Sequence, residues 1–154
     1  FIKDVQTIGT RKYQTLARRS CCLVSRVDER YNKLELNDLL STSDILSIHC
    51  PLNERTLNLI GARELAMMKP HAYLINMGRG AIVIEEDLAK AVDEGVIAGA
   101  GIDVFVREPI PEDHPYLKMK HPERMRLAPH VAWAATEARE RLVDIMAENI
   151  SMGW

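Results

Sequence analysis

Short apolar runs alternate with segments of helical composition along most of this chain, and the alternation limits the folds open to it. The first run, residues 44–50, is mostly apolar and suits a buried parallel strand. Three further strand candidates cover residues 72–76, 96–104 and 126–129. Segments of helical composition separate or follow them, at residues 62–68, 85–94 and 135–154. This order predicts βαβ units, and therefore an α/β fold with a Rossmann-like parallel sheet flanked by helices.

Turn and cap residues mark the ends of these segments. Pro51 stops the first run, and Gly95 ends the helix of residues 85–94. The apolar face of that helix comprises Leu88, Ala91 and Val92. Thr136 is the candidate N-cap of the last helix. The apolar side of the last helix is formed by Leu142, Ile145, Met146, Asn149 and Ile150.

The first third of the chain is harder to interpret. Residues 21–25 favour a strand, residues 36–40 a short helix, and residues 14–19 are compatible with a helix. Residues 1–33 carry a net charge of +5, whereas residues 34–154 carry −7. The first segment therefore differs in charge from the rest.

Composition excludes several classes of protein. A length of 154 residues suits one domain, and a net charge of −2 excludes a strongly basic nucleic-acid binder. Three cysteines make a poor disulfide framework and favour a reducing, cytoplasmic compartment. No apolar run approaches the roughly 18 residues of a membrane span, so no membrane partner is expected. The abrupt start at Phe1 and the helix at the other end suggest a piece of a longer chain.

Three ionisable residues follow three different predicted strands. Arg79, Glu108 and His130 would meet at one sheet edge, because the carboxyl ends of parallel strands lie together. A histidine with a carboxylate neighbour can exchange protons near neutral pH, and an arginine presents a planar fork to a carboxylate. This set suits protonation of the carbonyl oxygen of a small 2-oxo acid. Protein side chains supply no hydride, so a nicotinamide cofactor is implied.

Spacing alone leaves a plainer interpretation open. Arg79 could be an exposed turn residue, Glu108 a solvated loop charge and His130 a core histidine. The other histidines, His71, His114 and His121, have no metal-ligand spacing and are expected in exposed loops. His49 and Cys50 would point to opposite faces of a strand. No metal site is therefore expected.

Four linked motifs narrow the choice. Residues 68–80 read MKPHAYLINMGRG, residues 85–95 EEDLAKAVDEG, residues 98–109 AGAGIDVFVREP and residues 128–133 APHVAW. In this order and spacing they resemble the D-isomer-specific 2-hydroxyacid dehydrogenase family. The resemblance covers residues 44–154, and its end looks most like the glycerate dehydrogenase (hydroxypyruvate reductase) branch.

The resemblance implies a role for each matching residue. Arg79 would grip the substrate carboxylate, His130 would act as general acid/base, and Glu108 would pair with that histidine. Asp103 would lie near the nicotinamide, and Asn76 would tie the strand end to the following loop. The other residues expected to line the cofactor are Cys50, Met77, Gly78, Ala132 and Trp133, together with Arg79 and His130.

The phosphate-binding turn departs from the family pattern. The family opens its cofactor domain with G-x-G-x-x-G, whose glycines let the backbone approach the pyrophosphate at a helix N-terminus. Here residues 8–19 read IGTRKYQTLARR, and Gly9 is the only glycine among them. Residues 14–17 look like the start of the expected helix, but the side chains of residues 11–13 would crowd the diphosphate. A divergent or damaged segment over residues 1–33 accounts for this mismatch and for the basic excess.

The second cofactor determinant is also altered. Where the family often places an acidic residue for the ribose 2′-hydroxyl, this chain has Ser25 and Arg26. Arg26 could suit a 2′-phosphate, and hence NADP, or could simply be solvated. The sequence leaves NAD and NADP both open.

The whole chain is thus expected to be one incomplete NAD(P)-binding domain, without the family's substrate domain. The parent activity would be NAD(P)H-dependent reduction of a 2-oxo acid such as hydroxypyruvate to D-glycerate, in a homodimer. This chain alone would be weakly active or inactive. Two alternatives stay open: a non-catalytic dinucleotide-sensing module of the corepressor type, and an inactive fragment. The context of Trp133 favours the enzyme over the corepressor.

Overall fold

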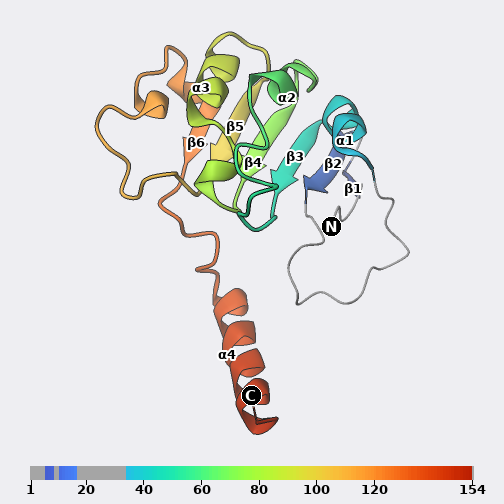
Figure 1. Cartoon of the computed structure of the whole chain (residues 1–154), viewed down its shortest axis with the longest axis vertical. Helices are drawn as coiled ribbons and strands as arrows, with labels where there is room; N and C mark the ends of the chain where they lie inside the picture. Colours follow the sequence, from blue (N-terminus) through green and yellow to red (C-terminus); the bar gives the residue numbers. More distant parts are fainter. Residues whose placement is uncertain (1–5, 9–10, 17–33, 154) are drawn as a thin grey trace.

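A single six-stranded sheet organises the computed structural model, which describes residues 6–8, 11–16 and 34–153 (Figure 1). The strands follow chain order across the sheet: β1 Gln6–Ile8, β2 Arg11–Leu16, β3 Ile45–Ile48, β4 Tyr73–Asn76, β5 Gly99–Ile102 and β6 Met125–Leu127. Neighbours from β2 to β6 pair in parallel, and β1 pairs antiparallel with β2. The predicted α/β class with a parallel sheet is therefore confirmed.

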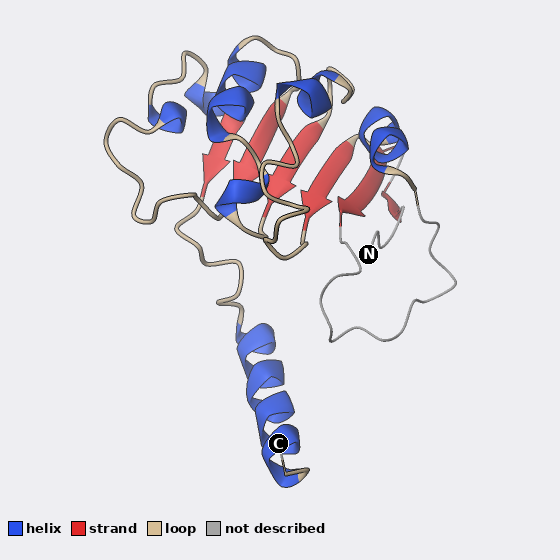
Figure 2. Cartoon of the chain, in the orientation of Figure 1, coloured by secondary structure: helices blue, strands red, loops and turns tan. Residues whose placement is uncertain are grey.

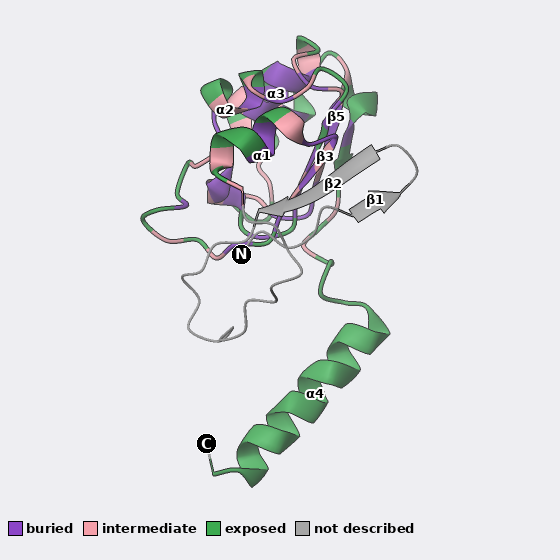
Figure 3. Cartoon of the chain, turned by 90° about the vertical axis from the view of Figure 1, so that its right-hand side faces the viewer, coloured by how far each residue is buried: buried purple, intermediate pink, exposed green. Residues whose placement is uncertain are grey.

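Helices on one face of the sheet enclose the core (Figures 2 and 3). They are α1 Leu36–Thr42, α2 Ala62–Ala66 and α3 Glu85–Asp93, with short 3₁₀ turns η1 Gly80–Ile82, η2 Pro115–Leu117 and η3 Pro122–Arg124. One-sided cover follows from consecutive strand order, because right-handed crossovers in one direction place their helices on the same face. Alternate residues of β3, β4 and β5 face these helices; Leu46, Ile48, Leu74 and Ile102 are buried there.

The predicted segments from residue 36 onward are confirmed, with adjusted ends. The face of α3 formed by Leu88, Ala91 and Val92 is buried, and Gly95 stops the helix with a φ of +72°. A positive φ strains any residue with a Cβ, so glycine suits this position. The strand predicted over residues 96–104 is shorter, because ladder pairing extends only over Gly99–Ile102.

The prediction of a helix from Gln14 is wrong for residues 14–16. They belong to β2, and Gln14, Thr15 and Leu16 lie in register with Leu46, Ser47 and Ile48 of β3. Cross-strand backbone hydrogen bonds to β3 have overridden a weak local preference. The strand predicted at residues 21–25 lies outside the described residues.

The last helix, α4 Thr136–Ser151, projects away from the sheet (Figure 3). The expected N-cap is wrong by one residue: Ala135 is the cap, and its carbonyl accepts the N–H groups of Ala138 and Arg139. The predicted apolar side is exposed; Leu142, Ile145, Met146 and Ile150 are each at least 46% accessible. Among the described residues, none of the helices has the length and apolar character that crossing a bilayer would need.

Matched leucine truncations should separate the core from α4. Leu74→Ala removes a fully buried side chain of β4 and should cost about 2–5 kcal/mol in the free energy of unfolding. The same change at the exposed Leu142 should cost at most about 0.5 kcal/mol. Urea denaturation followed by circular dichroism measures both, and equal costs would contradict this account of the core.

Candidate active site

The carboxyl ends of β3 to β6 meet at one sheet edge, and the ladder continues one step past several strands. Met77 donates its N–H to the Ile48 carbonyl (3.4 Å), and Asp103 donates to the Asn76 carbonyl (3.0 Å). Ala128 donates to the Ile102 carbonyl (2.9 Å). The segments that carry Cys50, Gly78, Asp103 and His130 therefore leave the sheet at the same edge.

Asn76 joins the end of β4 to the next loop, as predicted. Its side-chain oxygen accepts the Gly78 N–H (3.0 Å), and its side-chain nitrogen donates to the Arg79 carbonyl (3.0 Å). Asn76 is 1% exposed, so both bonds are shielded from water. The loop before Gly80 is thereby fixed, and Arg79 lies on its exposed side.

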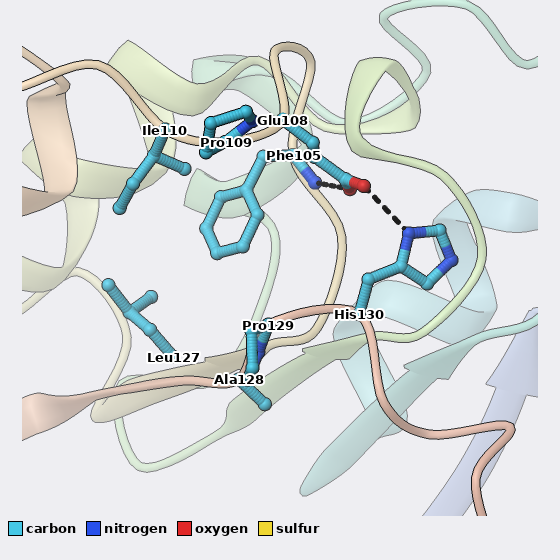
Figure 4. A pocket seen from close by; sticks show the side chains of 8 residues that line it. All are labelled: Phe105, Glu108, Pro109, Ile110, Leu127, Ala128, Pro129 and His130. Atoms are coloured by element: carbon cyan, nitrogen blue, oxygen red, sulfur yellow. Dashed lines mark hydrogen bonds and ion pairs between the residues drawn. The ribbon is translucent and has the colours of Figure 1, made fainter.

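Glu108 and His130 are in direct contact (Figure 4). His130 Nδ1 lies 2.8 Å from Glu108 Oε2, and the Phe105 N–H donates to Glu108 Oε1 (2.9 Å). The hydrogen bond from His130 holds the pKa of Glu108 below its ordinary value, assisted by the Phe105 N–H and by the charges of His130 and Arg79. A carboxylate at Nδ1 places the ring proton there, which leaves Nε2 on the side facing away from Glu108.

Asp103 fixes the segment that carries His130. Its Oδ1 accepts the N–H of Val131 and its Oδ2 that of Ala132, each at 2.8 Å. His130 has a φ of +56°, in the left-handed region that is costly for a residue with a Cβ. Two charge-assisted bonds directly after it hold the backbone in this conformation. Sequence reasoning did not foresee this function of Asp103.

Two hollows adjoin this edge on either side of the chain leaving β6. One, of about 470 Å³, lies beside the Glu108–His130 pair and is mainly apolar, with Phe105, Ile110, Leu127 and Pro129 in its wall (Figure 4). The other, of about 310 Å³, includes Met77, Asp103, Val131 and Ala132 in its lining. The second hollow brings together three of the residues expected to line the cofactor.

The remaining expected residues are placed as follows. Cys50 is buried at 2% exposure, and a Cβ on the buried Gly78 would lie 3.0 Å from the Cys50 carbonyl oxygen. Trp133 is 61% exposed, and its indole N–H donates to the His130 carbonyl (2.7 Å). Ser25 and Arg26 lie outside the described residues.

The expectation that His114 is an exposed loop residue is wrong. It is 3% exposed, because its ring packs between Phe105 and Tyr116. The His114-Pro115 step, where a proline opens a 3₁₀ turn capped by the histidine, is the sequence signal that could have indicated this. Among the described residues, no group of His, Cys, Asp and Glu side chains could hold a metal ion.

The phosphate end of a dinucleotide has no counterpart in the described backbone. The family pattern requires a strand, a glycine turn and a helix N-terminus. Here Ile8 pairs antiparallel with Arg11, and the chain continues as β2.

Comparison with known proteins agrees with this fold. Residues 7–132 match the family model described as D-isomer specific 2-hydroxyacid dehydrogenase, NAD binding domain. A glyoxylate reductase of Thermofilum pendens is 48% identical over 116 residues, which is 75% of this chain and 33% of that protein. A glyoxylate/hydroxypyruvate reductase B of Pectobacterium carotovorum is 43% identical over 128 residues, which is 82% of this chain and 39% of that protein.

A solved structure shows the same relationship. An acyclic imino acid reductase (Bsp5) in complex with NADPH and D-Arg superposes with a TM-score of 0.73 at 30% identity, covering 89% of this chain and 41% of that chain. The fold and the matches define an NAD-binding domain. The chain belongs to the D-isomer-specific 2-hydroxyacid dehydrogenase family, and it spans between 33% and 39% of the length of the two curated relatives above.

Acid titration should reveal the Glu108–His130 contact. A carboxyl whose pKa is lowered by folding stabilises the folded state above its unfolded-state pKa, and this contribution is lost as the pH falls through the folded-state value. The difference in unfolding free energy between the wild type and Glu108→Gln should therefore be largest above about pH 4.5 and shrink below it. Urea denaturation across this pH range measures the difference.

His130→Asn is the matched variant for that titration. It removes the main cause of the lowered pKa, so the pKa of Glu108 should rise toward its ordinary value. A wild-type minus Glu108→Gln difference that does not change with pH would show that the contact does not form in solution.

Proposed function

We propose that this chain forms the nicotinamide side of the active site of an NAD(P)H-dependent 2-oxo acid reductase, with glyoxylate or hydroxypyruvate as substrate. The observation that carries the proposal is the 2.8 Å contact between His130 and Glu108, at the sheet edge where Arg79 also lies. The relatives named glyoxylate and hydroxypyruvate reductase support the substrate class. We place the parent enzyme in the cytoplasm as a homodimer, following the family resemblance.

In this proposal each residue of the set has one task. The exposed Arg79 guanidinium binds the substrate carboxylate through two parallel hydrogen bonds. His130 Nε2 donates a proton to the carbonyl oxygen as it becomes an alcohol, and Glu108 stabilises the charged imidazolium on the Nδ1 side. A reduced nicotinamide, when bound, supplies the hydride for the carbonyl carbon.

The residues proposed to hold the nicotinamide lie around the hollow lined by Met77, Asp103 and Ala132. Gly78, Cys50 and Trp133 are proposed to complete this wall. Ser25 and Arg26 are proposed to determine whether NAD or NADP is preferred. The substrate would be open to water on the side away from the sheet, because the described residues supply one wall only.

Binding of the cofactor can be tested directly. We expect NADH or NADPH to shift the amide NMR signals of Gly78 and Ala132. Because the described backbone lacks the phosphate turn, reduced nicotinamide mononucleotide should bind within about tenfold of NADH, equivalent to about 1.4 kcal/mol. A folded sample whose signals do not move with any of these ligands would contradict the proposal and favour the inactive alternative.

Catalysis requires the missing wall, so a chimera provides the test. Residues 44–132 would replace the matching segment of the Thermofilum pendens glyoxylate reductase, which retains its own remaining sequence. The chimera should reduce glyoxylate, and His130→Asn should lower kcat by about 10²–10⁴-fold. Oxidation of NADH or NADPH, followed at 340 nm, measures the rate.

His71→Asn is the matched control. His71 also pairs with a carboxylate, since its Nε2 lies 3.0 Å from Asp44 Oδ1, but it precedes β4 at the opposite end of the sheet. The rate should be unchanged in this variant. Dinucleotide binding without turnover in the chimera would favour the sensing module, and equal losses in both histidine variants would contradict the assigned role of His130.

A further inference from the structure

A buried histidine and a glutamate meet behind the candidate active site. The side chain of His114 is 3% exposed and that of Glu85, the first residue of α3, is 11% exposed. His114 Nδ1 accepts the Tyr116 N–H (3.3 Å), which leaves the ring proton on Nε2. Nε2 lies 3.1 Å from Glu85 Oε2, at an angle that does not meet hydrogen-bond geometry, so the contact is electrostatic.

The second oxygen of Glu85 holds the backbone next to Glu108. Glu85 Oε1 accepts the Val106 N–H (2.9 Å), while the preceding N–H, that of Phe105, donates to Glu108 Oε1 (2.9 Å). Two consecutive amides are therefore bound by two different carboxylates. The backbone of Phe105 joins the two peptide units that carry these N–H groups, so it links the two carboxylates mechanically.

The Phe105–Val106 segment is also fixed on two further sides. The Phe105 ring meets the His114 ring edge-on, with centroids 5.8 Å apart at 89°. On the other side Gly80 packs against its backbone: a Cβ at Gly80 would lie 2.0 Å from the Phe105 carbonyl carbon. The segment is thus confined between the Glu85–His114 pair and the loop that carries Arg79.

We infer that Glu85 and His114 are positioning residues for the Glu108–His130 pair. Glu85 acts through the Val106 amide, and His114 acts by orienting the Glu85 carboxylate and packing against Phe105. Neither residue contacts the pair directly. The catalytic meaning of the inference rests on the proposed function, whereas the geometric effect is measurable in this chain without substrate or cofactor.

The test is a pH titration of ¹³C,¹⁵N-labelled chain by NMR, which follows the Glu108 carboxyl carbon and the Phe105 amide proton together. Glu85→Gln leaves one acceptor oxygen where there were two, while both the Val106 N–H and the Nε2 proton of His114 still point at the side chain. In either orientation the NH₂ group meets one of these donors and is repelled by it. The bond to the Val106 N–H should therefore weaken, and the Phe105 N–H should be reoriented. We expect the pKa of Glu108 to rise toward 4.5 and the pH-dependent shift of the Phe105 amide to be lost.

Substitutions of His114 provide the complementary test. His114→Phe keeps a ring against Phe105 but removes the donor to Glu85, so it should change the Glu108 titration in the same direction. His114→Gln retains an N–H donor near the Nε2 position and should restore much of the wild-type titration. The Glu85→Gln/His114→Phe double variant should change the titration less than the sum of the single variants, because both act through one contact.

Asp93→Asn is the matched structural control. Asp93 ends α3 and accepts the N–H groups of Lys120 (3.0 Å) and His121 (2.9 Å), so it anchors the far part of the same loop. This variant should lower the unfolding free energy without changing the titration of Glu108 or of the Phe105 amide.

The inference is overturned if Glu85→Gln and the His114 variants lower stability as Asp93→Asn does and leave both titrations at wild type. The pair would then be a loop anchor only. Failure of the proposed function gives a different result. In that case the chain binds no dinucleotide, or the chimera does not turn over, while the Glu108 titrations of the Glu85 and His114 variants still change as expected.

Discussion

The in-register parallel pairing of β3, β4, β5 and β6 is the constraint on which the rest of the structure depends. Ile48, Asn76, Ile102 and Leu127 occupy one level across these strands. The chain therefore leaves every strand at the same edge, and residues separated by more than fifty positions become neighbours. Pairing also forces alternate side chains toward the helices, so the same hydrogen bonds that build the core determine where the polar residues gather.

At that edge, carboxylates hold backbone N–H groups in place, in addition to any part they take in chemistry. Asp103 holds the amides that follow His130, Glu108 holds that of Phe105, and Glu85 holds that of Val106. An ionised oxygen that accepts backbone N–H groups forms a stronger bond than a neutral acceptor does. The site is thus preorganised by charge around a histidine whose own backbone is unfavourable, which limits the reorganisation needed during a reaction.

The sequence predicted the parts of this arrangement that depend on local pattern. The helix end at Gly95 and the buried face of α3 follow from turn chemistry and periodicity, whereas the bridging role of Asn76 was implied by the family resemblance. The convergence of Arg79, Glu108 and His130 at one edge followed from strand order. Contacts between distant residues could not be predicted in this way: Glu85 and His114 are 29 positions apart, and β2 is a strand because β1 and β3 offer it backbone partners. The exposure of the apolar side of α4 could not be predicted either, because an amphipathic pattern does not specify what packs against it.

The exposure of α4 has a consequence for cooperativity. A helix of 16 residues is near the length at which isolated helices are marginal in water, and helices in proteins owe most of their stability to packing of an apolar face. No residue of α4 is buried against the remainder of the described chain. The helix can therefore exchange between helix and coil without disturbing the sheet. Among the described residues, the cooperative unfolding unit ends before α4, close to Ala132, whose N–H donates to Asp103.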